Sequence, residues 1–109
     1  MEKGAMREWV SALERMVNNK LKKWDKQRKW ENGEAIHLMW QWEQTIIKLD
    51  IFWEDKKETI RLKYISPRED QDFMFDGLTG RTFNKIQDRV GNLSMRAMHP
   101  AIDPEDHQL

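Results

Sequence analysis

Residues 46–65 read IIKLDIFWEDKKETIRLKYI, and this stretch decides the fold. On both sides of the charged segment EDKK, large apolar residues recur at every second position. Successive side chains of a strand point to opposite faces of a sheet, so this alternation is typical of strands with one buried face. The stretch predicts a β-hairpin whose buried residues include Leu49, Ile51, Ile60 and Leu62.

The residues just before this hairpin also favour a strand. Over 34–43 the even positions hold Ile36, Leu38, Trp40 and Trp42. A helix over this segment is the alternative, but it would need a very wide apolar arc. The inward positions change from even to odd on entering the hairpin, so a turn or bulge is expected near residues 43–45.

Two features upstream complete the first half of the chain. An amphipathic helix is expected at the N-terminus, because apolar residues recur at spacings of three and four. These residues are Met6, Trp9, Val10, Leu13, Met16, Val17, Leu21 and Trp24. Basic residues from Lys20 onward would lie at the C-terminus of this helix, where cations interact favourably with the helix dipole. The following Asn32-Gly33 pair either closes a hairpin or separates two helices.

The last third of the chain predicts one more strand and a second helix. PheMetPhe at 73–75 is a short strand candidate, and Thr79 can cap a helix that presents Phe83, Ile86 and Val90. Gly91 stands where such a helix would end. Beyond it, the residues from His99 onward are polar and interrupted by proline.

These elements define the expected architecture. We predict an α+β fold in which a long N-terminal helix packs on an antiparallel sheet of three to five strands, followed by a short C-terminal helix. A single domain is expected over residues 1–98, with a flexible, mobile tail over 99–109.

Composition restricts the chemistry that the chain can perform. Cysteine is absent, so disulfide bonds and thiolate chemistry are excluded. The N-terminus lacks the apolar run of a signal peptide, and no stretch reaches the roughly 18 apolar residues that span a bilayer. Three scattered histidines and five dispersed glycines offer neither metal-ligand spacing nor a phosphate-binding loop. We therefore expect a cytoplasmic protein without a membrane partner, cofactor, metal, small-molecule substrate or catalytic site.

Tryptophan is the most unusual component of the sequence. All six tryptophans lie in the first half of the chain, and with seven methionines and four phenylalanines they exceed what one helix face and one sheet face readily bury. Tryptophan and methionine are enriched at protein interfaces. Trp30, Trp40 and Trp42 are the candidate interface anchors, and the alternative is a tryptophan-rich core. The predicted function is a small non-catalytic binding or regulatory protein acting through protein-protein contact, with a homodimer as one form of that contact.

The segment 20–30, KLKKWDKQRKW, gives an alternative function. Residues 1–33 carry nine basic and five acidic residues, a balance of +4, whereas 34–109 carry ten and fourteen, a balance of −4. Basic side chains contact phosphates, and exposed aromatic rings stack on unpaired bases. The candidate nucleic-acid-binding residues are Lys22, Lys23, Lys26, Arg28, Lys29 and Trp30. A solvated helix end or an edge strand protected by lysines would have the same composition, and a hydrolase with an unrecognised site is the third candidate.

Overall fold

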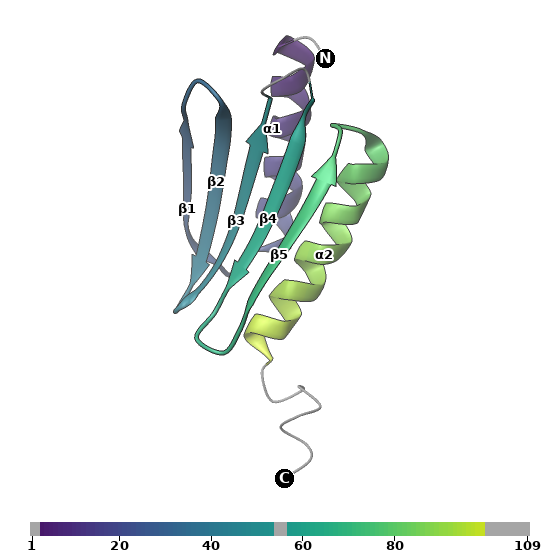
Figure 1. Cartoon of the computed structure of the whole chain (residues 1–109). Helices are drawn as coiled ribbons and strands as arrows, with labels where there is room; N and C mark the ends of the chain where they lie inside the picture. The colour runs from purple at the N-terminus through teal and green to yellow at the C-terminus, as the bar shows by residue number, and fades with distance from the viewer. Residues whose placement is uncertain (1–2, 54–56, 100–109) are drawn as a thin grey trace.

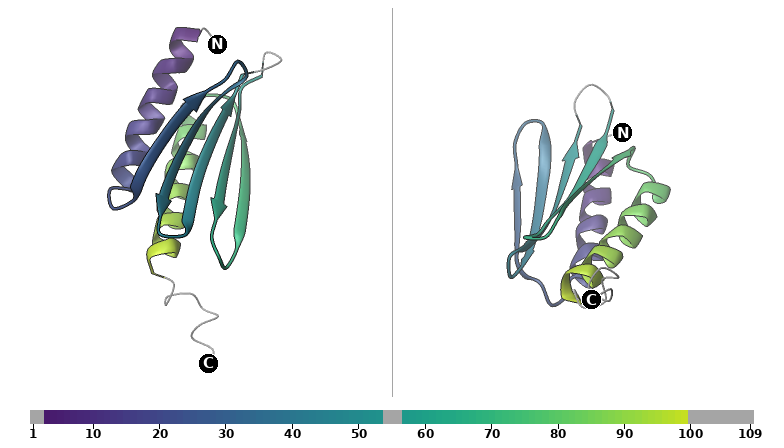
Figure 2. Two further views of the ribbon diagram at one scale, coloured as in Figure 1. Left: turned by 90° about the vertical axis from the view of Figure 1, so that its left-hand side faces the viewer. Right: turned by 60° about the horizontal axis from the view of Figure 1, so that its bottom comes forward.

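Two helices cover one face of a five-stranded antiparallel sheet (Figures 1 and 2). The computed structural model describes residues 3–53 and 57–99. The elements follow in the order α1 (Lys3–Lys20), β1 (Asp25–Glu31), β2 (Ala35–Trp42), β3 (Thr45–Phe52), β4 (Thr59–Ile65), β5 (Asp70–Asp76) and α2 (Gly80–Met98). Neighbouring strands of the sheet are also neighbours in the chain. The predicted α+β arrangement is confirmed.

The hairpin predicted over 46–65 is formed by β3 and β4. Leu49 pairs with Leu62, and Ile51 pairs with Ile60. All four side chains are buried, as predicted. Residues 54–56, which include most of the charged EDKK segment, lie outside the described residues.

The strand prediction for residues 34–43 is also confirmed, and the helical alternative is wrong. β2 pairs with β3 along its whole length, so that Leu38 lies opposite Leu49 and Trp40 opposite Ile47. The change from even to odd inward positions occurs in the turn between these strands. There Glu43 has a φ of 53°, a left-handed conformation that tight hairpin turns require.

The Asn32-Gly33 pair closes a hairpin between β1 and β2, the first of its two predicted roles. Asn32 Oδ1 accepts hydrogen bonds from the backbone N–H groups of Glu34 and Ala35, both at 2.8 Å. These bonds hold the turn and fix the orientation of the Asn32 amide.

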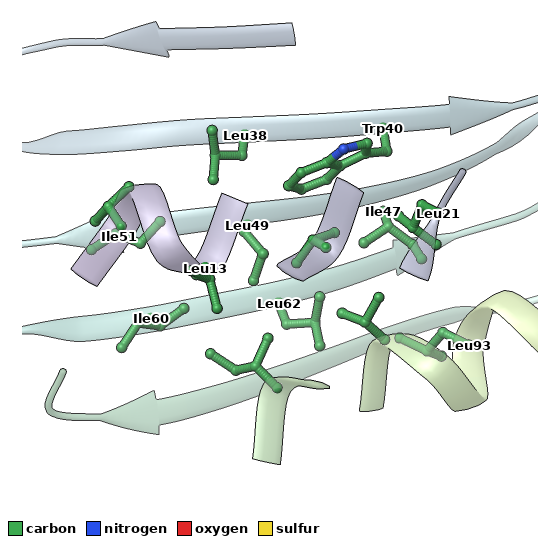
Figure 3. Packing of buried hydrophobic residues seen from close by; sticks show 14 of the residues in the cluster. Leu13, Leu21, Leu38, Trp40, Ile47, Leu49, Ile51, Ile60, Leu62 and Leu93 are labelled. Carbon is green, nitrogen blue, oxygen red and sulfur yellow. The ribbon is translucent and has the colours of Figure 1, made fainter. Parts of the chain in front are cut away.

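The hydrophobic core lies between the sheet and the two helices (Figure 3). Each helix directs an apolar stripe toward the sheet. This stripe contacts the inward side chains of β2, β3 and β4. The fully buried residues include Val10, Leu13 and Val17 from α1, Ile86 and Val90 from α2, and Leu38, Trp40, Ile47, Leu49, Ile51, Ile60 and Leu62 from the sheet. The predicted stripe of the N-terminal helix is confirmed up to Val17, whereas Leu21 and Trp24, predicted on the same helix, are buried beyond its end at Lys20.

The C-terminal helix begins as predicted but does not end as predicted. Thr79 is its N-cap, and the Thr79 Oγ1 accepts a hydrogen bond from the Thr82 N–H at 3.1 Å. The predicted end at Gly91 is wrong, because α2 continues to Met98 and has 19 residues. Leu93 and Ala97 extend its buried stripe, which outweighs the roughly 1 kcal/mol that a glycine costs inside a helix. Of the predicted tail, His99 caps this helix, and 100–109 lie outside the described residues.

Replacing Gly91 with alanine should stabilise the protein by about 0.5 to 1 kcal/mol, because alanine is the better helix former. A Cβ atom added at this position meets nothing within 4 Å. Thermal unfolding followed by circular dichroism should show a rise of roughly 2 to 8 °C. Gly77→Ala is the matched control and should destabilise, because the Gly77 φ of 83° is strained for any other residue. A lower melting temperature for Gly91→Ala would contradict the helical assignment.

The basic segment after α1 forms mainly an edge strand. Only Lys20 lies in the last turn of the helix, and residues 25–31 form β1 at the margin of the sheet. The placement of the whole basic run at the end of a helix is therefore corrected. Charged side chains on an edge strand discourage pairing with other chains through the free backbone groups.

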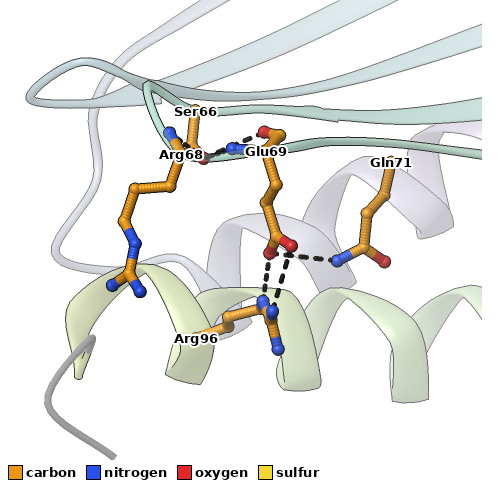
Figure 4. Close-up of polar contacts among 5 residues, drawn as sticks. All are labelled: Ser66, Arg68, Glu69, Gln71 and Arg96. Atoms are coloured by element: carbon orange, nitrogen blue, oxygen red, sulfur yellow. Dashed lines mark hydrogen bonds and ion pairs between the residues drawn. The ribbon is translucent and has the colours of Figure 1, made fainter. Parts of the chain in front are cut away.

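Polar contacts attach the last part of α2 to the turn between β4 and β5 (Figure 4). Ser66 Oγ donates to the Glu69 carbonyl at 2.9 Å and accepts from the Glu69 N–H at 3.1 Å. The Glu69 carboxylate in turn accepts hydrogen bonds from the Arg96 guanidinium and from the Gln71 side chain. Burial raises the pKa of the neighbouring Tyr64 hydroxyl. These contacts join α2 to the sheet on the same side as α1, and no helix of the described residues covers the opposite side.

Candidate binding face of the sheet

The sheet face that carries no helix, here called the open face, presents two cross-strand rows of side chains. The leucines paired across β2, β3 and β4 are buried beneath the helices, so residues one position away face the other side. The Trp30 row consists of Trp30, His37, Asp50, Arg61 and Met74. The Arg28 row consists of Arg28, Met39, Lys48, Lys63 and Asp72.

The Trp30 side chain is held in place by its neighbours while remaining accessible. Its ring stacks on His37 with centroids 5.1 Å apart and an interplanar angle of 19°. The Lys48 Nζ lies 5.5 Å and the Arg28 Cζ 5.8 Å from the indole centroid, distances typical of cation–π contact. Trp30 is nevertheless 39% exposed. The result is a fixed aromatic surface flanked by two cations.

The His37 ring is in turn held by a buried carboxylate on the neighbouring strand β3. The His37 Nδ1 lies 2.6 Å from the Asp50 Oδ1, and Asp50 is only 4% exposed. On the other side of the ring, the His37 Nε2 lies 3.3 Å from the Asn32 Nδ2. The Asn32 oxygen is occupied by the backbone N–H groups of the turn, so the amide presents its NH₂ to the ring. Both nitrogens of the His37 ring thus lie within hydrogen-bonding distance of a polar side chain.

This arrangement positions His37 as a support and not as an accessible base. A histidine oriented by a carboxylate also occurs in nucleophilic active sites, where the second nitrogen faces a nucleophile. Here both ring nitrogens already have partners. In addition, Phe52 meets the His37 ring edge-on, with centroids 6.4 Å apart. The cluster presents the exposed Trp30 ring for contact and stacking.

The β5 edge of the open face is acidic. Asp70, Asp72 and Asp76 alternate along β5 with the inward residues and are all exposed. Arg61 donates to Asp72 from Nε at 3.0 Å and from Nη2 at 2.5 Å. This bond lowers the pKa of the Asp72 carboxyl and raises the pKa of the Arg61 guanidinium. The open face is thus acidic on β5, whereas β1 carries both Arg28 and Asp25 there.

The Arg61–Asp72 pair should make stability depend on acid in a defined direction. Because the folded-state pKa of Asp72 is lowered, its contribution is complete above the usual value of 3.8 and is lost as the pH falls below it. Urea midpoints between pH 5 and pH 2 should therefore decrease more for the unmodified protein than for Asp72→Asn. A difference between the two proteins that stays constant over this range would contradict the ion pair.

The three candidate interface tryptophans lie in different environments. Trp30 is on the open face, whereas Trp40 is 2% exposed, and its Nε1 donates to the Asn18 Oδ1 at 2.8 Å. Trp42 is half-buried against the core and packs on Trp24 with centroids 6.5 Å apart. Trp40 therefore offers no accessible ring, and Trp30 presents the most accessible of the three.

The six candidate nucleic-acid-binding residues do not share one surface. Arg28 and Trp30 belong to the open face, but Lys29 turns to the helix side, where its Nζ lies 3.1 Å from the Glu14 Oε1. Lys22 and Lys23 are exposed in the turn after α1. The Lys26 side chain lies outside what the structure describes. Within the described part of the segment, only Arg28 and Trp30 act together.

Comparison with known proteins adds no relative. No protein-family model matches the chain, no curated protein matches it significantly in sequence, and no solved structure matches it significantly. Neither helix in the described ranges is long and apolar enough to cross a membrane. Over those same ranges, no three His, Cys, Asp or Glu residues lie close enough to hold a metal ion.

Sequence reasoning missed the partners that Trp30 finds on the sheet. His37, Lys48 and Asp50 occupy ordinary outward positions of predicted strands, where polar residues are expected. Only the pairing of β1 with β2, and of β2 with β3, brings them next to Trp30. The signal in the sequence was Asp50, a charged residue between Leu49 and Ile51 in a predicted strand.

Proposed function

We propose that this protein acts without catalysis, as a small cytoplasmic regulatory protein that binds another protein through the open face. The observation that carries the proposal is the exposed indole of Trp30, which is stacked on His37 and flanked by Arg28 and Lys48. Tryptophan and arginine are the residue types that most often dominate binding energy at protein interfaces.

The geometry of Trp30 favours binding because the ring is already ordered. Immobilising a flexible side chain on binding costs free energy, and a ring fixed in the free protein avoids most of that cost. The same face also exposes Met74, at 59%, and Ile65. Trp30 and Met74 lie at opposite edges of the face, with charged side chains of both signs between them. Exposed tryptophan and methionine are residue types enriched at protein interfaces.

Capture from native lysate tests this proposal. The tagged protein should retain a protein that survives nuclease treatment, and Trp30→Ala should lose most of it. Met95→Ala is the matched control, because Met95 is exposed on α2 in the other layer and should not affect capture. A captured set that is unchanged by Trp30→Ala would overturn the proposal, provided that circular dichroism shows the variant to be folded.

Single-stranded nucleic acid is the second candidate partner, because two cations lie beside an exposed aromatic ring. Such a combination can hold a base and its phosphates. Against it, Lys48 and Arg61 are paired with Asp50 and Asp72, and the aspartates of β5 would repel phosphates.

Oligonucleotide titration distinguishes the two candidates. If nucleic acid binds here, Arg28→Gln and Lys48→Gln should each weaken binding and reduce its salt slope by about one unit. Lys85→Gln, on the exposed side of α2, should leave it unchanged. Absence of binding to any single strand at low salt would eliminate this candidate.

A further inference from the structure

We propose that the free edge of β5 binds an extended basic segment of a partner protein, which adds to the sheet as a sixth strand. In this mode of recognition, backbone hydrogen bonds give affinity and alternate side chains give specificity. The inference goes beyond the proposed contact at Trp30, because Trp30 lies on β1 at the other edge of the sheet.

The outer side of β5 carries a regular row of unpaired backbone groups. Backbone hydrogen bonds of 2.9 Å close both ends of the ladder between β4 and β5, from the Ser66 N–H to the Glu69 carbonyl and from the Gly77 N–H to the Glu58 carbonyl. Hydrogen-bonded pairs alternate with non-bonded pairs along an antiparallel ladder. Alternation from either end gives the same result: Asp70, Asp72 and Met74 direct their N–H and C=O groups away from β4.

These outward groups are available to an added strand. Over residues 3–53 and 57–99, no hydrogen bond reaches the outward groups of Asp70, Asp72 or Met74. The row ends at Asp76, whose carbonyl accepts a hydrogen bond from the Thr82 Oγ1 at 3.1 Å. β5 is the outermost strand on this side of the sheet (Figure 1). Each of the three residues therefore offers one donor and one acceptor.

The opposite edge of the sheet is protected against strand addition in ways that β5 is not. The register of β1 shifts between Asp25 and Arg28, and its helix-side residues Lys29 and Glu31 are charged and bonded to α1. Irregular register and inward charges both discourage edge pairing. β5 keeps one register over all seven of its residues and contains neither proline nor lysine. Its aspartates repel an acidic strand but attract a basic one.

The side chains of β5 define the sequence pattern of the added strand. Phe73 and Phe75 are only half-buried on the helix side, so apolar side chains of an added strand would cover them. The Arg89 Cζ lies 4.4 Å from the Phe73 ring centroid and disfavours a second cation on that side. Asp70 and Asp72 are exposed on the open face, where opposite charges on neighbouring strands are favourable. The fitting segment is therefore basic toward the open face and apolar toward the helices.

Basic residues of β4 weaken this attraction without removing it. Arg61 is bonded to Asp72, and Lys63 lies opposite it. An added strand would lie about 4.8 Å from β5 and about 9.6 Å from β4, and the second distance is close to the Debye length at physiological ionic strength. Asp70 forms no ion pair with any described residue. The nearer aspartates therefore determine which charge is attracted.

Other strands from this chain fit the edge poorly. Two-fold pairing of β5 with β5 of a second copy sets aspartate opposite aspartate, whichever of the residues 72–74 lies at the centre. β1 of a second copy would bring the charged Lys29 and Glu31 beside the phenylalanines. Residues 100–109 contain three acidic side chains and neither lysine nor arginine. Like charge therefore disfavours them as well.

The test measures binding of a probe peptide to the purified full chain by fluorescence anisotropy. The peptide has seven residues, as β5 does, with lysine first, fifth and seventh, leucine third and valine elsewhere. Antiparallel pairing sets its lysines opposite the three aspartates. Because the peptide becomes ordered on binding, we expect a dissociation constant of roughly 10 to 500 μM. A peptide with glutamate in place of lysine should bind at least about tenfold more weakly.

Two changes to the backbone separate strand addition from attraction between charges. N-methyl groups on the lysine and leucine amides leave the peptide's charges in place but remove the donors that would face β5. Met74→Pro removes an outward N–H of the protein without losing a bond to β4, a position where an edge strand accepts proline. Each change should weaken binding at least about tenfold. Met74→Ala, which keeps the N–H, is the matched control and should bind within about threefold of the unmodified chain.

Three results would overturn the proposal. They are absence of binding up to about 1 mM lysine peptide, equal binding of the N-methylated peptide, or unchanged binding by a Met74→Pro variant that circular dichroism shows to be folded. The N-methylated peptide is tested on the unmodified chain, so the proposal stays testable if Met74→Pro does not fold. Trp30→Ala should bind the peptide as the unmodified chain does. A negative result at this edge therefore leaves the lysate capture to decide the proposed function separately.

Discussion

Replacing Trp40 with alanine should lower the free energy of unfolding by about 3 to 5 kcal/mol, the largest effect expected of any substitution considered for this protein. Trp40 is 2% exposed and has the largest of the fully buried side chains. Its removal leaves a cavity between β2 and the helices. It also leaves the Asn18 Oδ1 without the indole N–H that now donates to it at 2.8 Å, which adds to the cost.

Urea denaturation of Trp40→Ala and Trp30→Ala, side by side, measures this effect. Trp30→Ala should cost at most about 1 kcal/mol, because its ring is on the surface and a cation–π contact there contributes little. The comparison uses the same change in the same kind of element. Equal losses of stability in the two variants would show that Trp30 also supports the fold, and would remove the main reason to regard it as an interface residue.

The contrast between these two tryptophans bears on the composition of the chain. Trp24 and Trp40 are buried, and Trp9, Trp42 and Trp53 pack partly buried against the core. Five of the six tryptophans are therefore accounted for by packing alone. The abundance of tryptophan reflects the core, and Trp30 is the one tryptophan classed as exposed.

The fold could be predicted where a buried face gives the sequence a clear period. In β2, β3 and β4 the inward residues are large and apolar, so alternation identified each strand. β1 has no such pattern, because its helix-facing residues are charged and pair with α1. There Arg7 donates to the Glu31 carboxylate at 2.8 Å, and Lys29 contacts Glu14. An edge strand held by ion pairs leaves no hydrophobic signal in the sequence.

The open face could be predicted only in part. Alternation places His37 and Asp50 on the outer side of their strands, but it does not indicate which outer residues become neighbours. That depends on the register, and in β1 the register shifts between Asp25 and Arg28. The turn after β1 fixes the regular register of residues 28–31, which places Trp30 opposite His37 and alternates successive side chains between the two faces. A segment read as a continuous basic run is thereby divided, with Arg28 on one face and Lys29 on the other.

Replacing Ile51 with alanine should destabilise the protein by about 2 to 4 kcal/mol, because Ile51 is completely buried and pairs with Ile60 in the core. Ile65→Ala is the matched control. Ile65 is on the adjacent strand β4 but 37% exposed on the open face, so its loss should cost less than about 1 kcal/mol. Both values come from urea denaturation at neutral pH.

The same pair of variants tests the face on which Asp50 lies. Side chains alternate along a strand, so a shift of one residue in β3 would exchange Ile51 with Asp50 between the core and the open face. In the structure, Asp50 supports His37 and through it Trp30. A loss below roughly 0.5 kcal/mol for Ile51→Ala would place Ile51 outside the core and Asp50 inside it. Trp30 would then lack the support on which its proposed role in binding depends.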